Sequence, residues 1–586
     1  MTPEPSPSPT QLIIPSPGAA TWDIVAQWVA IGILIACTVA VIFFVFNYLP
    51  KVKKIKPFYA SIAAVAVLGG VFAFLLPVAF NSGFGKDDDG RVLRQLILYT
   101  TGGVLGVITL GETHRKNNQE KEKNENDHTR QVYAERRSRY TKAVEQLANE
   151  NAAVRLGGIY TLVGLVDEWL ADESLTEDKQ KEEGQVIINN LCSYIRSPFL
   201  VLEKIEEYEA YKVFKNFETK GNAKLKEADY LQVLDIFERF IDSDEYEEPK
   251  DITTDYAKFH EEQDVRRTIF VEMSKRSSIV KPAGYGEVSV TPNTWSSFNF
   301  DFSRAPIFYS LSKLTIEEAN FTSARFYDES SFSEAIFTKT ADFSQAEFTK
   351  TADFWSATFA ETADFSWAKF THTADFSWAK FTQTADFRGA TFTETADFRG
   401  ATFAKTADFS QAEFTKTADF WSATFAETAD FSQAEFTKTA TFRAATFTET
   451  ADFRRAIFKG IANFDDSTFN RIACFSGAIF KGIACFGEAT FEKYSPLFVT
   501  TSDESGKTYR ALFAVLSDNQ GEHKFTVVRE GSKLIEPGEA TLRGKPYTIP
   551  VGTVLFDWDD EIQGFITSEP AKPLDESDEV EEDKSE

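Results

Sequence analysis

The side chains most able to do chemistry in this sequence are aspartates that recur once every eleven residues. Nine of them form the series Asp342, Asp353, Asp364, Asp375, Asp386, Asp397, Asp408, Asp419 and Asp430. Paired carboxylates can act as general acid and general base, but these lie in one repeated phrase and lack a unique acid or base partner. The series therefore predicts columns of surface charge, which are candidates for an interaction site.

Histidine and cysteine, the other candidate catalytic or metal-binding residues, are few and scattered. No two of the five histidines are neighbours, and none has a cysteine at metal-ligand spacing: His114, His128, His260, His372 and His523. The four cysteines, which form no C-x-x-C pair and fit a reducing compartment, are Cys37, Cys192, Cys474 and Cys485. No P-loop, H-E-x-x-H or nucleophile elbow occurs. We expect no enzyme activity, cofactor or metal; an enzyme in the C-terminal β-prone region is the remaining alternative.

The element that must position the aspartates is a phenylalanine repeat. Between Phe321 and Phe491, 32 phenylalanines alternate at spacings of five and six, and an alanine stands two residues before nearly every one. In an α-helix a step of five residues turns by roughly 500°, so successive rings would not share a face. In a β-solenoid each step is one short side of a coil, and every ring points inward. We expect a core that includes Phe343, Phe348, Phe354, Phe359, Phe365 and Phe370.

The repeat resembles the pentapeptide-repeat family, whose signature is A-(D/N)-(L/F)-x-x in tandem. The unit here is A-D-F-S-Q-A-E-F-T-K-T, as in residues 341–351, and the resemblance covers 319–491. It implies a right-handed quadrilateral β-helix with four steps, or about 22 residues, per coil. Roughly eight coils at ~4.8 Å would make a rod about 38 Å long. Alternate aspartates would then stack into two columns on different faces.

Two functions are open for such a rod. The resemblance implies that an acidic rod can mimic the DNA phosphate backbone for a DNA-binding enzyme such as a topoisomerase. However, Thr340–Ser366 recurs letter for letter as Thr406–Ser432, and a spacer or docking surface tolerates such duplication better than a specific site does. The formal net charge of −27 argues against direct nucleic-acid binding. We expect a scaffold or protein-docking module with an unidentified protein partner and no small-molecule substrate.

The N-terminal region predicts a multi-pass membrane anchor. Residues 1–22 are Pro/Ser-rich and expected to be disordered. Residues 23–111 contain three apolar stretches expected to span a bilayer, at 24–49, 58–80 and 94–111. The loop after the first is rich in lysine (Lys51, Lys53, Lys54, Lys56), whereas the next holds Asp87, Asp88 and Asp89. Because basic loops stay inside, we expect the N-terminus outside a bacterial plasma membrane and the bulk of the chain in the cytoplasm.

Residues 112–285 predict a cytoplasmic α-helical region. A juxtamembrane helix is expected to Arg139, and a helix follows over 140–170. The phrases R-Y-T-K-A-V-E-Q-L (139–147) and A-V-R-L-G-G-I-Y-T-L (153–162) resemble the segment after the last span of membrane-anchored bacterial pentapeptide-repeat proteins. Residues 186–196 and 263–269 resemble later helices of that segment. The stretch 202–241 departs from the family and predicts two further helices, at 205–217 and 228–240.

The remaining stretches are expected to flank the rod. Residues 286–318 are β-prone and aromatic, and predict an N-terminal cap. Residues 492–570 contain short β-prone runs separated by turn residues such as Gly506 and Pro537, and predict a small β domain or C-terminal cap. Residues 571–586 form an acidic tail that is expected to be disordered.

Overall fold

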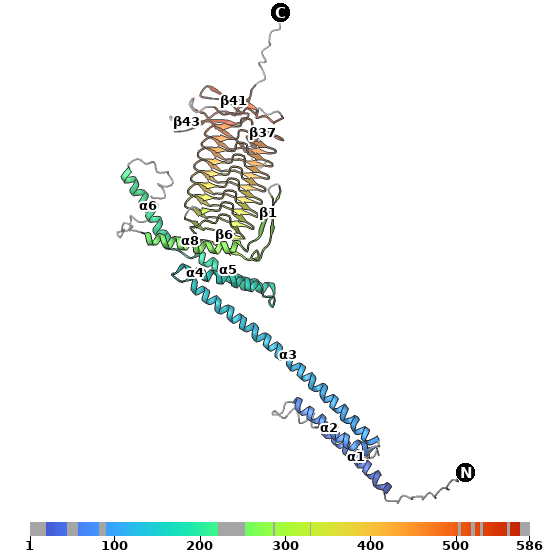
Figure 1. The fold of residues 1–586 in the computed structure, drawn as a ribbon. Coiled ribbons are helices and arrows are strands. Elements are labelled where there is room, and N and C mark those ends of the chain that lie inside the picture. The colour runs from blue at the N-terminus through green and yellow to red at the C-terminus, as the bar shows by residue number, and fades with distance from the viewer. Residues whose placement is uncertain are drawn as a thin grey trace, which may run out of the picture. The chain divides into compact units, whose positions relative to one another are not determined.

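The computed structural model describes residues 19–43, 57–80, 89–220, 252–284, 287–327, 330–501, 506–516, 522–527, 531–559 and 563–574. The chain divides into two compact units, Met1–Glu135 and Arg136–Glu586. Figure 1 shows the helices and the stacked strands that make up these units.

The first unit contains apolar helices. Helices α1 (Ala19–Phe43) and α2 (Pro57–Ala79) pack through a small apolar cluster centred on Ala30, Leu34 and Ala79. Among the residues that the structure describes, three helices are long and apolar enough to cross a membrane by length and composition, namely α1, α2 and the helix that starts at Asp89. The predicted apolar helices are thus confirmed, while 44–49 of the first predicted span lie outside the described residues.

The stretch predicted as a juxtamembrane helix continues directly into residues 140–147. Helix α3 runs without a break from Asp89 to Leu147, and α4 (Ala152–Leu170) begins after a short turn. The turn falls at Asn149–Asn151, because the Asn151 side chain accepts a hydrogen bond from the Ala153 backbone N–H at 2.9 Å and caps the new helix. Gly158 allows α4 to approach α3 closely, since a Cβ there would lie 2.8 Å from the Ala143 carbonyl oxygen.

The second unit begins with a helical layer. It comprises the end of α3, α4, α5 (Glu177–Arg196), α6 (Val201–Lys220) and α8 (Thr253–Ser274). The core of the layer includes Leu165, Leu191 and Ile269, all fully buried. Helix α8 covers the N-terminal end of the rod (Figure 1), where the Phe270 ring lies 4.6 Å from that of Phe302. The helix predicted at 205–217 lies within α6, and the one predicted at 228–240 lies outside the described residues.

The rod is a β-solenoid with four parallel sheets, which the chain visits in the order 1, 2, 3, 4. Sheet 1 consists of β3 (Phe300–Asp301), β6 (Ala319–Asn320), β10 (Ala341–Asp342), β14 (Ala363–Asp364), β18 (Ala385–Asp386), β22 (Ala407–Asp408), β26 (Ala429–Asp430), β30 (Ala451–Asp452) and β34 (Ala473–Cys474). Sheet 2 contains β4 (Pro306–Ile307), β7 (Arg325–Phe326), β11 (Glu347–Phe348), β15 (Lys369–Phe370), β19 (Thr391–Phe392), β23 (Glu413–Phe414), β27 (Glu435–Phe436), β31 (Ile457–Phe458) and β35 (Ile479–Phe480).

Sheets 3 and 4 complete each coil. Sheet 3 consists of β8 (Ser330–Ser331), β12 (Ala352–Asp353), β16 (Ala374–Asp375), β20 (Ala396–Asp397), β24 (Ala418–Asp419), β28 (Ala440–Thr441), β32 (Ala462–Asn463) and β36 (Ala484–Cys485). Sheet 4 consists of β5 (Thr315–Ile316), β9 (Ile336–Phe337), β13 (Thr358–Phe359), β17 (Lys380–Phe381), β21 (Thr402–Phe403), β25 (Thr424–Phe425), β29 (Thr446–Phe447), β33 (Thr468–Phe469) and β37 (Thr490–Phe491).

The register gives 22 residues per coil and a core of stacked phenylalanine rings. Ala341 pairs with Ala363, and the Phe343 ring stacks on that of Phe365 at 4.8 Å with an interplanar angle of 1°. The fold and its phenylalanine core are thus as predicted. The rod begins one coil earlier than the predicted start at 319, at Phe300, so sheet 1 has nine strands. The repeat phrase does not reveal this coil, because aliphatic residues such as Ile307 and Ile316 replace phenylalanine there.

A hairpin precedes the rod, and a tenth coil of different sequence closes its C-terminal end. The hairpin pairs β1 (Ile279–Gly284) with β2 (Glu287–Thr291). In the last coil, Leu497 bridges to sheet 1, β40 (Leu512–Ala514) extends sheet 2, and Lys524 bridges to sheet 3. The Lys533 N–H donates to the Phe491 carbonyl on sheet 4 at 2.7 Å. The Phe513 ring continues the core by stacking on Phe480 at 4.8 Å.

Further strands cover this last coil. The hairpin β38 (Val499–Thr501)–β39 (Thr508–Arg510) leaves its first corner, and β43 (Val554–Asp559) pairs with β40 and with β44 (Gly564–Thr567). A small antiparallel sheet contains β41 (Pro537–Leu542), β42 (Lys545–Pro550) and β45 (Lys572–Pro573). The C-terminal β region is therefore present and caps the rod. Pro537, predicted as a turn residue, instead begins β41, where Pro fits because it opens the strand.

Candidate interaction surface of the solenoid

The outward aspartates stack in two carboxylate columns, one on sheet 1 and one on sheet 3. The first column consists of Asp342, Asp364, Asp386, Asp408, Asp430 and Asp452; the second consists of Asp353, Asp375, Asp397 and Asp419. This is the stacking that the 22-residue coil predicts. The side chains are only partly accessible, and Asp397 and Asp452 are 8% and 6% exposed.

Each carboxylate of these columns caps the turn that follows it. The Asp375 Oδ1 atom accepts hydrogen bonds from the Ser377 backbone N–H at 2.8 Å and from its hydroxyl at 2.6 Å. The same bond from the backbone N–H two residues on recurs along both columns, for example at Asp386 (2.9 Å) and Asp419 (3.0 Å). Such Asx turns stabilise a chain that must change direction after two residues. The aspartates therefore have a structural role at the corner that follows each of them.

Burial, together with stacking, raises the pKa of several of these carboxyls. Partial burial raises the pKa of Asp375, Asp386, Asp419 and Asp430, and neighbouring carboxylates of the same column raise it further. Arginines offset part of this repulsion. The Arg399 guanidinium pairs with Asp397 at 2.5 Å, and Arg454 pairs with Asp452 at 2.5 Å.

The largest exposed apolar groups of the rod lie at its corners. Each turn between sheets 1 and 2, and each turn between sheets 3 and 4, places one residue in the left-handed region, with φ of 55–60° at the non-glycine positions. Trp355, Trp378 and Trp421 occupy turns between sheets 3 and 4, and they are 42–54% exposed. Corner amides bind the next coil, as when the Trp378 N–H donates to the Arg399 carbonyl at 2.8 Å. We call Trp355, Trp378 and Trp421, with Arg399 and Arg443, the tryptophan edge.

One further tryptophan lies on a different corner and matches Trp378 closely. Trp367 occupies a turn between sheets 1 and 2 and is 54% exposed, as is Trp378. Both rings lie over a glycine of the next coil: a Cβ at Gly389 would be 2.6 Å from the Trp367 ring, and one at Gly400 would be 2.8 Å from the Trp378 ring. The sequence reasoning missed these tryptophans. The pairing of each with a glycine 22 residues later is the pattern that could have found them.

A buried polar network joins α4, α5 and α8 of the helical layer, and its Arg266 guanidinium lies over the Phe308 ring of the first coil at 5.4 Å. The Arg266 guanidinium pairs with Glu262 at 2.7 Å and donates to the Ile195 and Ser197 carbonyls at 2.8 and 3.0 Å. Arg155 also pairs with Glu262, at 3.1 Å, and burial raises the pKa of the Tyr194 hydroxyl, which donates to Glu262. Every charged group here has a partner, so the network is suited to hold the rod on its base.

The described residues contain no cluster of three or more His, Cys, Asp or Glu side chains that could hold a metal ion. Cys474 lies on sheet 1 and Cys485 on sheet 3, so the two are not stacked. Burial raises the pKa of the Cys485 thiol, which disfavours the thiolate needed of a nucleophile.

Four parallel sheets of two-residue strands around a stacked core define the rod as a β-solenoid. A family model for pentapeptide repeats (nine copies) matches residues 312–358, 376–424 and 420–468. The chain thus carries a pentapeptide-repeat domain, as its sequence resemblance indicated. No curated protein matches the chain, and no solved structure matches it.

Proposed function

We propose that this protein is a non-enzymatic docking scaffold, anchored in a bacterial plasma membrane, that presents the solenoid to a protein partner in the cytoplasm. The observation that carries the proposal is the tryptophan edge on a rod whose remaining corners are mostly small or polar. Tryptophan and arginine are the residues most enriched among the binding hot spots of protein interfaces.

The geometry of the edge supports docking of a protein surface. Trp355 and Trp421 lie three coils apart, which at a coil repeat of 4.8 Å corresponds to about 14 Å along the rod. Trp378 and Arg399 lie between them. Because the Trp378 ring rests against Gly400 of the next coil, little side-chain entropy is lost when a partner covers it.

The anchor and its orientation follow from the apolar helices and the charges between them. Lys51, Lys53, Lys54 and Lys56 separate α1 from α2, while Asp87, Asp88 and Asp89 precede or open α3. This distribution favours the N-terminus outside and the solenoid in the cytoplasm. An enzyme role is disfavoured because the perturbed carboxyls are repeated turn caps rather than a unique pair.

Mimicry of DNA by the carboxylate columns is the alternative, and the charge pattern weighs against it. Residues 341–450 hold 16 carboxylates and nine Lys or Arg, a net charge of −7 over five coils, and residues 363–406 are neutral. At 4.8 Å per coil this is one net charge per about 3.4 Å, against one per about 1.7 Å in duplex DNA. The carboxylates also face their own turns, which leaves fewer lone pairs for a basic partner.

The test is photocrosslinking of the full chain in intact cells, with the photoreactive residue placed on one of two corners of the rod in two separate variants. A photoreactive residue replaces Ser422 beside Trp421 on the tryptophan edge, or Gln411 on the corner that carries Trp367. Both positions have φ near 60°, and tryptophan occupies the equivalent position elsewhere in the rod. We expect a discrete protein adduct from position 422 and a much weaker one from 411.

Tryptophan variants provide the matched control. Serine occurs naturally at equivalent corners, so Trp378→Ser and Trp421→Ser should fold, and together they should abolish the adduct. Trp367→Ser should leave it intact. Equal adducts from both corners, or a salt-sensitive adduct with a DNA-binding enzyme that survives loss of the tryptophans, would refute the docking edge and favour mimicry.

A further inference from the structure

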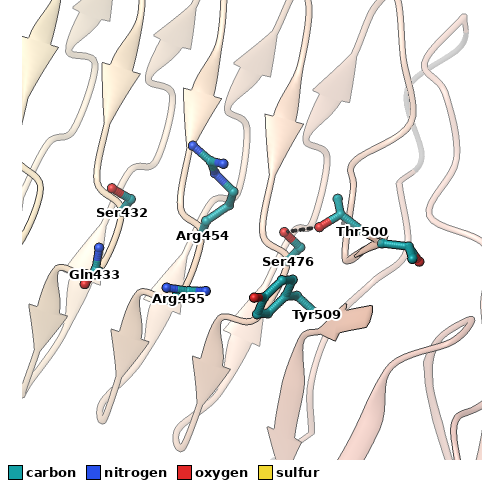
Figure 2. Close-up of a pocket in the computed structure, with 8 residues that line it drawn as sticks. Ser432, Gln433, Arg454, Arg455, Ser476, Thr500 and Tyr509 are labelled. Carbon is teal, nitrogen blue, oxygen red and sulfur yellow. Dashed lines mark hydrogen bonds between the residues drawn. The ribbon is translucent and has the colours of Figure 1, made fainter. Parts of the chain in front are cut away.

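A polar groove lies on the solenoid where the repeat meets its C-terminal cap. It has a volume of about 510 Å³ and is lined by Ser432, Gln433, Arg454, Arg455, Ser476, Thr500, Thr501 and Tyr509. Figure 2 shows that it is bounded by three successive corner turns between sheets 1 and 2 on one side, and by the Thr500 and Tyr509 side chains on the other. The Thr500 hydroxyl donates to the Ser476 hydroxyl at 2.9 Å, which ties the β38–β39 hairpin to the rod.

The charge of the groove differs from that of the rest of this face. Arg454 pairs with Asp452, the last carboxylate of the first column, and the next position of the column is Cys474 instead of aspartate. Arg455 lies over the Tyr509 ring at 4.8 Å from its centre, and Lys507 lies over the same ring at 5.3 Å. A ring contact leaves guanidinium N–H groups free to donate. The groove therefore carries positive charge where the acidic column ends.

A glycine one coil further along the chain leaves space for the Arg455 side chain. Gly477 follows Arg455 by one coil and has φ of +73°; a Cβ there would lie 3.3 Å from the Arg455 Cγ. The equivalent corner residues in the coils before are Gln433 and Gln411. The Arg454–Arg455 pair is thus a local departure from the repeat, accompanied by a glycine that accepts the long side chain and by the Tyr509 ring that covers it.

We propose that this groove binds a small oxyanion, either a phosphate monoester or a carboxylate, with Arg455 as the principal ligand. The planar guanidinium donates two parallel hydrogen bonds to two oxygens of either group. The Ser432 and Thr501 hydroxyls and the Gln433 amide line the same volume and can donate to the remaining oxygens. The volume suits a small molecule. This site is independent of docking on the tryptophan edge, which lies on a different corner.

The test is calorimetric titration of the full chain in detergent with inorganic phosphate and, separately, with succinate. Arg455→Gln restores the residue that the repeat has at this corner, so it should fold. Arg388→Ser is the matched control, since it removes the same charge from the same corner three coils away and serine is the usual residue there. Asp503 and Glu504 follow Thr501 in the sequence, so each titration is repeated in a D503N/E504Q background to remove competing carboxylates.

We expect binding of at least one of the two probes, weakened at least tenfold by Arg455→Gln and changed less than twofold by Arg388→Ser. Tighter binding of phosphate would identify a phosphate monoester as the ligand class, and tighter binding of succinate would identify a carboxylate. Equal weakening by the two variants, which indicates only general charge attraction, would overturn the proposal. So would a lack of binding in both backgrounds.

Discussion

The carboxylate columns make a sharp prediction, because a substitution can remove the charge of an aspartate without removing its turn cap. Asp375→Asn keeps an oxygen that accepts from the Ser377 N–H, as Asn463 does naturally in the same column for the Asp465 N–H at 2.8 Å. Asp375→Ala removes that oxygen and leaves a buried N–H without its partner. The two variants therefore separate the cap from the charge.

The expected magnitudes follow from these contacts. Loss of the partner of a buried N–H costs about 1–3 kcal/mol, so Asp375→Ala should destabilise its coil by that amount. Two unit charges 4–5 Å apart in water repel by about 1 kcal/mol, and Asp353 and Asp397 flank Asp375 in the column. Since Arg399 offsets part of this repulsion, Asp375→Asn should be neutral or stabilising by about 0.5–1 kcal/mol.

The pH dependence has a definite sign. Burial and the neighbouring carboxylates raise the folded-state pKa of Asp375, so the folded protein binds the proton more tightly than the unfolded chain does. The free energy of unfolding must then fall as the pH rises through the window between the unfolded and folded pKa values. The advantage of Asp375→Asn over wild type should therefore be present at pH 7 and shrink near pH 4.

Hydrogen exchange of the full chain in detergent measures the local opening free energy of each coil. Peptides that cover residues 374–381 report on the substituted coil, and peptides that cover 440–447 serve as the internal control. Equal protection in the Asn and Ala variants would refute the assignment of Asp375 as a turn cap. Destabilisation of the coil by Asp375→Asn at pH 7 would refute the repulsion argument.

Four further predictions address the core, a corner, the cap and the anchor. Phe387→Ala should cost about 3–5 kcal/mol in local exchange protection, because the ring stacks on Phe365 at 4.9 Å and on Phe409 at 4.8 Å. Gly400→Ala should displace the Trp378 ring and red-shift tryptophan emission, because the added Cβ would collide with the ring. Gly506 also has a positive φ, but a Cβ there meets nothing within 4 Å, so Gly506→Ala is the control for the effect of positive φ alone. The His523 imidazole accepts a hydrogen bond from the Ala484 N–H at 3.1 Å, and burial lowers its pKa. Its contribution to cap stability should therefore be present above pH 6.5 and lost as the pH falls. Hydrogen exchange of residues 484–491 measures this change. A cysteine at Lys53 should resist an impermeant maleimide in intact cells while one at Asp88 reacts, and the reverse pattern would invert the proposed orientation.

Much of the rod was predictable because its sequence is strictly periodic. The spacing of Phe343, Phe348 and Phe354 admits only one structure in which all rings share an interior, and the period of the aspartates fixes which of them stack. The apolar helices are equally predictable, since the length and hydropathy of a stretch are enough to identify them. The first coil, which starts at Phe300, and the last coil, which contains Phe513, could not be recognised as repeats in the sequence. Only contact with the neighbouring coil shows that Ile307 and Phe513 occupy core positions.

The sequence by itself determined the solenoid, its core and the existence of two carboxylate columns, since a period of eleven repeats the same local geometry at every turn. Tertiary structure alone decided what these groups do. It showed that the Asp375 carboxylate caps its own turn, and that Trp355, Trp378 and Trp421 share one corner while Trp367 lies on another. It also brought Tyr509 from the cap onto Arg455. The Arg455–Tyr509 contact joins residues more than two coils apart in the sequence, so no local spacing specifies it. The Asp375 cap reaches only two residues along the chain, but it depends on the sharp turn that the solenoid imposes there.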